Sequence, residues 1–173
     1  MMRGLSGRLA LLVVVAATIG CDRVTKHAAT TMLSGAPGRS YLADTVRLEY
    51  AENPGAFLSL GADLTPPART ALLTVANGLL LLALIVFAVR RTLAGRPALG
   101  LALFAAGGAS NWIDRIARGS VVDFLNVGVA SVRTGVFNVA DVAIMLGAAV
   151  FLLSELRHAS GAGPSARPDD GTA

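Results

Sequence analysis

The chain is poor in the residues on which redox proteins, metal sites and soluble domains depend. Its 173 residues include one cysteine, Cys21, which excludes an internal disulfide framework and a cysteine-based zinc cluster. The two histidines, His27 and His158, lie far apart in the sequence, so a histidine-rich metal site is not expected either. Only 15% of the residues are charged, whereas a soluble domain usually carries about 25%. With 54% hydrophobic residues and a mean hydropathy of +0.62, the composition predicts an integral membrane protein.

Basic residues are also too dispersed for a nucleic-acid-binding protein. The net charge is +4 and the isoelectric point is near 10.2. However, Lys26 is the only lysine, and the arginines form no basic stripe interleaved with aromatic residues. The sequence therefore excludes nucleic acid as the expected partner.

Four apolar runs, at residues 9–21, 71–89, 98–113 and 142–153, organise the chain. A membrane-spanning helix needs roughly 20 residues. When each run is extended to that length, the sequence predicts four transmembrane helices, at about 9–29, 69–90, 97–116 and 137–156. We expect one four-helix membrane domain over residues 1–157 and a disordered cytoplasmic tail over residues 158–173, where the sequence is small, polar and proline-bearing.

The orientation follows from the density of basic residues near the helix ends. The short connection 90–97 holds Arg90, Arg91 and Arg96, and both ends of the chain are also basic. We therefore expect both termini in the cytoplasm, with the connections 30–67 and 117–136 on the other side. Residues 45–50 alternate in polarity as a strand does, and NPG at 53–55 is typical of a turn. These signals predict a small extracytoplasmic β element between the first two helices.

The N-terminus permits a second interpretation. Residues 1–21 have the basic start, apolar core and small terminal residues of a secretory signal, and TIGC at 18–21 resembles a lipoprotein cleavage box. Against cleavage, Thr18 stands where such a box prefers leucine. In addition, Asp22 and Lys26 are four residues apart, the spacing and order that favour an ion pair on one continuing helix. We therefore expect an uncleaved first helix in which Cys21 is a small buried apolar residue.

Polar residues cluster at one end of three of the four predicted helices and in the connections beside them. An aspartate at the centre of a bilayer costs about 2.5–3.5 kcal/mol, so such groups need one another or a wet cavity. We expect Asp22 to pair with Lys26, and Asp114 to pair with Arg115, which is also able to hold a carbonyl of a loop or a substrate. The full set is Asp22, Lys26, Asn53, Asn111, Asp114, Arg115, Asp123, Asn138 and Asp141.

Asp123 and Asp141 differ from the other acidic residues because neither has a cation at helical spacing. Two carboxylates that face each other raise the pKa of one of them, so that one stays protonated as an acid while the other acts as a base that activates water. Such a pair needs no metal, no cofactor and no nucleophilic side chain. Asn111 and Asn138 have a simpler interpretation as hydrogen-bonding links between helices.

Five short motifs in order along the chain resemble those of the bacterial lipoprotein signal peptidase family, signal peptidase II. They are DRVTK at 22–26, NPGAF at 53–57, GGASNWIDR at 107–115, GSVVDF at 119–124 and FNVAD at 137–141. The likeness runs from about residue 8 to residue 156. It departs at Phe57, which follows a single alanine where the family often has two small residues.

The resemblance implies a multi-pass aspartyl endopeptidase of the bacterial inner membrane, and we expect it to be a monomer. Its substrates would be prolipoproteins carrying a diacylglyceryl-modified cysteine, cut just before that cysteine at the extracytoplasmic boundary of the membrane lipid. By position, Asp123 and Asp141 match the catalytic pair. The positions that match substrate-contacting or dyad-supporting residues are Asn53, Asn111, Arg115, Asn138, Asp22 and Lys26.

Three other functions remain open at this point. A small proton-coupled transporter would also carry membrane carboxylates, but it predicts acids near mid-bilayer, whereas here they cluster at one end. A membrane alcohol phosphotransferase is suggested by DRIARGSVVDF at 114–124, although Val127 stands where that metal motif expects a further acid. The third is a purely structural four-helix protein.

Overall fold

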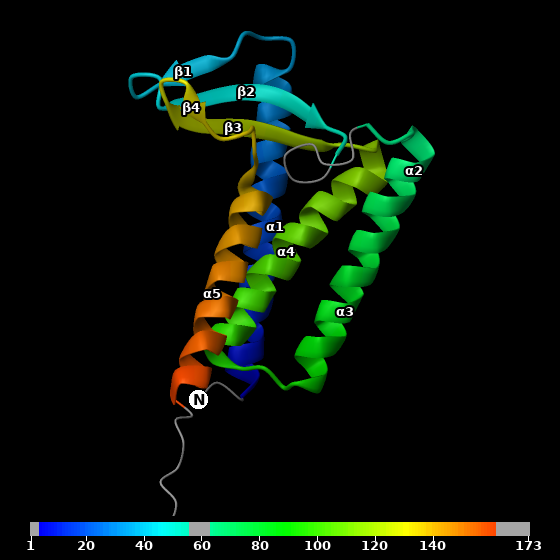
Figure 1. The fold of residues 1–173 in the computed structure, drawn as a ribbon, viewed down its shortest axis with the longest axis vertical. Coiled ribbons are helices and arrows are strands. Elements are labelled where there is room, and N and C mark those ends of the chain that lie inside the picture. Colours follow the sequence, from blue (N-terminus) through cyan, green and yellow to red (C-terminus); the bar gives the residue numbers. More distant parts are fainter. Residues whose placement is uncertain (1–3, 56–62, 162–173) are drawn as a thin grey trace, which may run out of the picture.

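The computed structural model describes residues 4–55 and 63–161 and is mostly helical, with one small antiparallel sheet (Figure 1). The chain enters through α1 (Leu5–Leu33) and forms the strands β1 (Arg39–Tyr41) and β2 (Val46–Asn53). A short helix α2 (Pro66–Thr70) continues through a π-helical segment η2 (Ala71–Ala76) into α3 (Asn77–Arg90). The remaining elements are α4 (Gly95–Arg118), β3 (Val121–Val129), β4 (Val132–Arg133) and α5 (Val139–Gly161).

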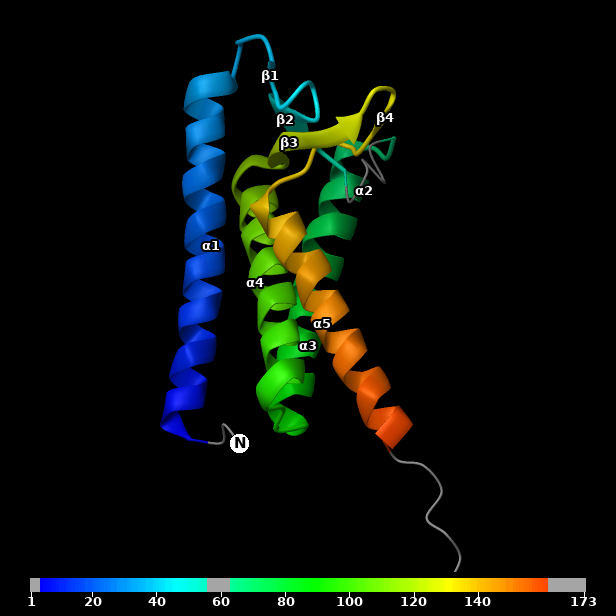
Figure 2. The ribbon, with the colours of Figure 1, turned by 90° about the vertical axis from the view of Figure 1, so that its left-hand side faces the viewer.

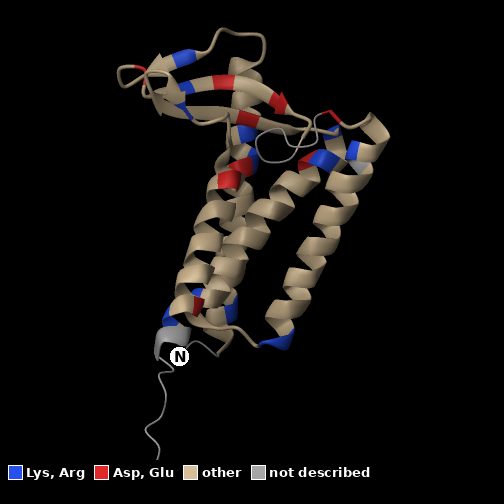
Figure 3. Cartoon of the chain, viewed as in Figure 1, with Lys and Arg blue, Asp and Glu red and all other residues tan. Residues whose placement is uncertain are grey.

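Within the described part of the chain, three helical segments are long and apolar enough to cross a membrane: Leu5–Leu33, Pro66–Arg90 and Val139–His158. Charged residues gather at the two ends of the helices and leave the middle of the bundle uncharged (Figure 3). α4 has 24 residues, a length of roughly 36 Å at 1.5 Å per residue. It is less apolar than the other three because glycines and polar residues such as Asn111 and Asp114 occupy many of its positions. The structure is thus mostly helical, as predicted, and three of the four predicted spans are among its candidate spans; α4, at the place of the remaining one, is not.

α4 lies inside the bundle, where it contacts α1, α3 and α5 (Figures 1 and 2). Its contact with α5 depends on glycines. A Cβ on Gly100 would stand 2.6 Å from the backbone nitrogen of Phe151, and one on Gly107 would collide with the carbonyl oxygen of Ala140. On α5, a Cβ on Gly147 would meet the backbone nitrogen of Phe104. Small residues allow this close approach of helix backbones, as is usual in membrane bundles.

The sheet has the order β1-β2-β3-β4 and joins two distant parts of the chain. β2 pairs antiparallel with β3, with Asn53 opposite Val121 and Val46 opposite Val127. The sheet sits on the C-terminal end of α1 (Figure 1), where Ala29 and Leu33 pack against Val122 and Phe124. The predicted strand after the first helix is present as β2, whereas β3 and β4 were not predicted.

Helix ends and the environment of Cys21 differ from the predictions. α1 extends four residues beyond each predicted end, to Leu5 and Leu33, and α5 continues to Gly161 into the predicted tail. The rest of that tail, residues 162–173, lies outside the described residues, as does Phe57. The expectation that Cys21 is buried was wrong: its side chain is exposed on α1. Burial falls instead on the neighbouring Asp22, because the polar face of α1 points into the protein at this level.

Candidate active site

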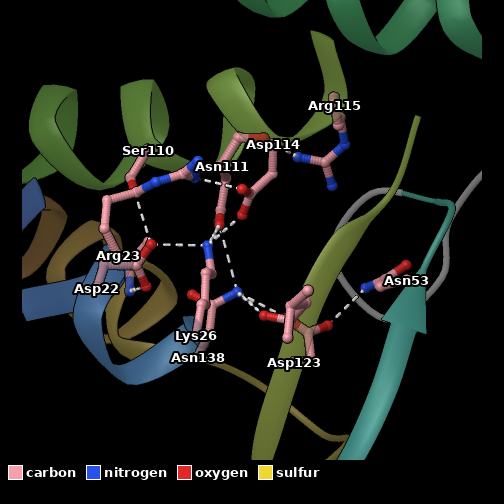
Figure 4. Close-up of polar contacts among 12 residues, drawn as sticks. Asp22, Arg23, Lys26, Asn53, Ser110, Asn111, Asp114, Arg115, Asp123 and Asn138 are labelled. Atoms are coloured by element: carbon pink, nitrogen blue, oxygen red, sulfur yellow. Dashed lines mark hydrogen bonds and ion pairs between the residues drawn. The ribbon is translucent and has the colours of Figure 1, made fainter. Parts of the chain in front are cut away.

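The polar residues singled out in the sequence meet at the end of the bundle that carries the sheet (Figure 4). They arrive from α1, the end of β2, α4, β3 and the start of α5. Asp22, Asp114, Asp123 and Asn138 are almost completely buried. Buried polar groups of this kind require hydrogen-bond or ion-pair partners, and those partners define the geometry of the site.

Asp123 lies in β3, shortly after the end of α4. Gly119 ends that helix in the left-handed conformation, with φ of +75°, and its amide donates to the carbonyl of Arg115 at 2.9 Å. This glycine cap turns the chain from the helix into the strand. The Asp123 carboxylate is 2% exposed and accepts amide hydrogen bonds from Asn138 at 2.6 Å and from Asn53 at 3.0 Å.

The surroundings of Asp123 favour its protonated form. Burial raises the pKa of Asp123 from 3.8 to about 6, the two amide donors oppose this change, and the negative charge of Asp141 adds to it. Burial has the largest effect because a carboxylate loses more hydration in an apolar setting than two neutral donors restore. Asp123 is therefore able to change its protonation state near neutral pH, as an acid–base group must.

Asp141 belongs to a reciprocal cap at the start of α5. Asn138 immediately precedes the helix, and its Oδ1 accepts the backbone amide of Asp141 at 2.9 Å. In return, the Asp141 carboxylate accepts the backbone amide of Asn138 at 3.1 Å. This is the geometry of a capping box. The other carboxylate oxygen of Asp141 accepts a hydrogen bond from the Asn111 amide at 2.9 Å.

Asn138 therefore connects both aspartates. Its Nδ2 donates to Asp123, while its Oδ1 and its backbone amide hold Asp141. The Asn138 side chain cannot rotate without losing these bonds, because its oxygen and nitrogen are both committed. The two carboxylates, 18 residues apart in the sequence, are thus fixed relative to each other through one buried side chain.

Lys26 organises the layer behind the carboxylates. Its ammonium lies 2.7 Å from Asp22, 2.8 Å from Asp114 and 2.7 Å from Oδ1 of Asn111. An ammonium has only donors, so it fixes the carbonyl side of Asn111 toward itself and turns the amide nitrogen toward Asp141. The predicted ion pair between Asp22 and Lys26 is confirmed.

Asp22 also holds the start of α5 in place. Its Oδ1 accepts the backbone amide of Ala140 at 2.8 Å, and its Oδ2 accepts the hydroxyl of Ser110 at 2.7 Å. A negative charge at the N-terminus of a helix is favourable because the free amides there carry partial positive charge. Asp22 thus links α1, α4 and α5 through Ser110 and through Ala140, the residue before Asp141.

Arg115 does not pair with Asp114 as predicted. Asp114 faces α1, where it forms ion pairs with Lys26 and Arg23. Arg115 instead donates to the carbonyl of Gly55 at 2.7 Å, in the loop after β2. That loop is shaped by Asn53, whose side-chain oxygen accepts the amide of Gly55 at 3.0 Å. The prediction that Arg115 holds a loop carbonyl is confirmed. Asp114 and Arg115 have different partners because adjacent residues on a helix point in different directions.

The sequence did not predict two residues of the polar site, Arg23 and Ser110, or the reciprocal cap formed by Asn138 and Asp141. Arg23 and Ser110 reach Asp114 and Asp22 only through the packing of α1 against α4. The reciprocal cap had a recognisable signal, an asparagine followed three residues later by an acid before an apolar run.

The apolar helices indicate a membrane-embedded protein, and the comparisons with known proteins identify the class as a membrane peptidase. The family model described as Signal peptidase (SPase) II matches residues 14–157. The lipoprotein signal peptidase of Pelodictyon phaeoclathratiforme is 33% identical over 149 residues, covering 81% of this chain and 86% of the relative. That of Sphingopyxis alaskensis is 34% identical over 161 residues, covering 89% of this chain and 92% of the relative.

Solved structures show the same fold. A bacterial membrane enzyme structure determined by the in meso method at 2.3 Å resolution superimposes with a TM-score of 0.78 and 22% identity, covering 92% of this chain and 94% of that one. The chain belongs to the signal peptidase II family, a family of aspartic-type peptidases.

Proposed function

We propose that this chain removes the signal peptide from diacylglyceryl-modified prolipoproteins, with Asp123 and Asp141 as the catalytic pair. The observation that carries the proposal is the single side chain of Asn138, which orients both carboxylates at one end of the apolar helices. The lipoprotein signal peptidases to which the chain is similar provide the substrate class. No metal or cofactor takes part in the proposed reaction.

The reaction needs one proton shared between the two carboxylates. The ionised aspartate takes a proton from water, and the resulting hydroxide attacks the carbonyl carbon of the scissile peptide bond. The protonated aspartate gives its proton to the carbonyl oxygen, forming a tetrahedral intermediate. As the carbon–nitrogen bond breaks, the aspartate that accepted the water proton passes it to the departing nitrogen of the lipidated cysteine. At the same time the other aspartate takes back a proton from a hydroxyl group of the intermediate, which restores the proton shared by the pair. The products are a signal peptide with a new carboxylate and a lipoprotein that begins with cysteine.

Arg115 and Asn53 are placed to receive the substrate beside the dyad. Arg115 at the end of α4 holds the loop after β2 through the carbonyl of Gly55, and Asn53 at the end of β2 bonds directly to Asp123. Among the described residues, nothing accepts a hydrogen bond from the buried Nε of Arg115. A donor held in this way suits a peptide carbonyl of the substrate. Asn111, Lys26 and Asp22 act behind the pair, as residues that orient it.

The distribution of charged residues supports a placement in the membrane. We propose that α4 is a fourth crossing, that both termini lie in the cytoplasm, and that the sheet and the site lie at the extracytoplasmic boundary of the inner membrane. The arginines at the opposite end support this orientation by the positive-inside rule (Figure 3). At that boundary the acyl chains of the substrate stay in the bilayer while water reaches the scissile bond. The enzyme is proposed to act as a monomer.

Cleavage of a lipidated precursor by the purified protein tests the proposal. A diacylglyceryl-modified prolipoprotein and its unlipidated form are incubated with the protein in detergent, with excess chelator. We expect cleavage of the lipidated form alone, and a loss of at least about a hundredfold in Asp141→Asn, since acid–base groups contribute at least that much. Glu155→Gln, an exposed carboxylate change near the far end of α5, is the matched control.

Two results would contradict the proposal. Near-normal cleavage by a folded Asp123→Asn or Asp141→Asn variant would show that the two aspartates are not the catalytic pair. If the folded wild-type protein cleaved neither precursor, the proposed peptidase function would be wrong. Proton-coupled transport in proteoliposomes would then be assayed.

A further inference from the structure

A groove lies at the end of the bundle opposite the carboxylate site. It has a volume of about 900 Å³, the upper part of the range of roughly 300–1,000 Å³ found for small-molecule pockets. The groove separates the start of α1 from the end of α3, with the first turns of α4 between them. Its lining residues are Gly7, Arg8, Ala10, Leu11, Val14, Ala88, Val89, Thr92, Leu93, Ala94, Gly95, Arg96 and Leu99.

Both charged residues that line this groove are positive. Arg8 and Arg96 come from different helices and both line it. Every other lining residue is uncharged, and apolar side chains such as Leu11, Val14 and Leu99 make up its wall. The sequence contains no acidic residue between Asp63 and Asp114, so α3 and the start of α4 offer no counter-charge for the two arginines.

An occupant must therefore combine an apolar chain with a negative charge at one end. Arg8 precedes Val14 by six residues on α1, roughly 9 Å along the axis at 1.5 Å per residue, so the groove runs from a basic end into the apolar part of the bundle. A basic pocket between membrane helices is suited to an anionic lipid head group. A basic peptide segment does not fit, because like charges repel at close range.

We propose that the groove binds one anionic phospholipid from the leaflet around the N-terminus of α1. The phosphate lies between Arg8 and Arg96, and an acyl chain lies along Leu11, Val14 and Leu99. The bound lipid fills the space between α1 and α3. The site is separate from the carboxylates, and the inference does not depend on the proposed peptidase function.

Lipid binding by the purified full chain tests the inference. Native mass spectrometry measures the binding of dioleoyl phosphatidylglycerol, with dioleoyl phosphatidylcholine as the zwitterionic probe with the same acyl chains. We expect tighter binding of phosphatidylglycerol, weakened about fivefold by Arg8→Gln and about fivefold by Arg96→Gln, the usual contribution of one basic residue near a membrane surface. Arg157→Gln, an exposed arginine near the C-terminal end of α5 that does not line the groove, is the matched control and should leave binding unchanged.

A steric pair of variants tests the groove itself. Ala10 lines it, whereas Ala16 is an exposed alanine on the same helix that does not. We expect Ala10→Phe to weaken phosphatidylglycerol binding at least as much as Arg8→Gln, and Ala16→Phe to leave it unchanged. Thermal melting of each variant in lipid-free detergent confirms that it is folded.

Three outcomes would overturn the inference. The first is equal binding of the two lipids by the wild-type protein. The second is an equal loss of phosphatidylglycerol binding in Arg157→Gln, which would indicate general attraction to positive charge. The third is a dimer that disappears in Ala10→Phe without any dependence on lipid, because a second copy of the chain would then occupy the groove. None of these measurements uses peptide cleavage, so their failure is distinguishable from a failure of the proposed function.

Discussion

Asn138 is the residue on which the geometry of the site depends most. It caps α5 and bonds to both carboxylates. Replacing it with alanine removes the cap, a change that costs about 0.5–2 kcal/mol, and leaves Asp123 without one of its two amide donors. We expect Asn138→Ala to fold with a lower melting temperature and to lose most of its cleavage activity.

A capping change elsewhere separates stability from positioning. Gly119→Ala strains the left-handed cap of α4, at about 1–2 kcal/mol, and leaves every side-chain contact of Asn138 in place. We expect Gly119→Ala to lower the melting temperature about as much as Asn138→Ala does. We expect it to reduce cleavage far less than Asn138→Ala does. Equal losses of cleavage in the two variants would contradict the positioning role of Asn138.

Asp123 should make stability depend on pH in a defined window. The pKa of Asp123 is about 6 in the folded protein and 3.8 without its folded surroundings. Between these values the folded protein keeps a proton that the unfolded chain has released, so a rising pH favours unfolding. We expect the stabilisation of the wild-type protein relative to Asp123→Asn to fall from about pH 4 to about pH 6 and then to stay level. Thermal melting of both proteins across pH 4–8 measures this; a relative stabilisation that rises over this window would contradict the shift.

At the scale of elements, the contact between α4 and α5 depends on glycine. A Cβ on Gly147 would meet the backbone of α4 at Phe104 and Gly100, whereas a Cβ on Gly20 of α1 meets nothing within 4 Å. We expect Gly147→Ala to destabilise the protein by about 1–3 kcal/mol, the usual cost of overpacking. Gly20→Ala should be neutral or slightly stabilising, because alanine favours helices. Melting temperatures in detergent compare the two, and equal effects would contradict close packing as the reason for the glycine.

Some helices and strands could be predicted from the sequence, and others could not. Long apolar runs predicted the helices because a bilayer demands about 20 apolar residues. β3 has no alternating pattern, since it is buried over Val121–Phe124, and a strand without alternation cannot be told from a buried helix segment by periodicity. The pairing of Asp22 with Ala140 across 118 residues is likewise invisible in the sequence.

At the scale of the whole molecule, the proposed orientation predicts which loops are accessible from the extracytoplasmic side of the inner membrane. Starting from Cys21→Ala, a cysteine is placed at Ala43, in the turn between β1 and β2, or at Thr92, between α3 and α4; both positions are exposed. We expect an impermeant maleimide to label Ala43→Cys in intact spheroplasts and Thr92→Cys only after permeabilisation. The reverse pattern would show that the chain has the opposite orientation.

The sequence by itself determined the membrane class, the approximate helices and the identity of the polar residues, because hydropathy and a conspicuous acid in an apolar run are local properties. It also suggested the family through five short motifs in order. Only the tertiary structure decided how those residues meet: that Asp114 pairs with α1 and not with Arg115, and that Asn138 lies between Asp123 and Asp141. The physical reason is that each partner comes from a different element, and buried polar groups find their partners only when helices and sheet pack together.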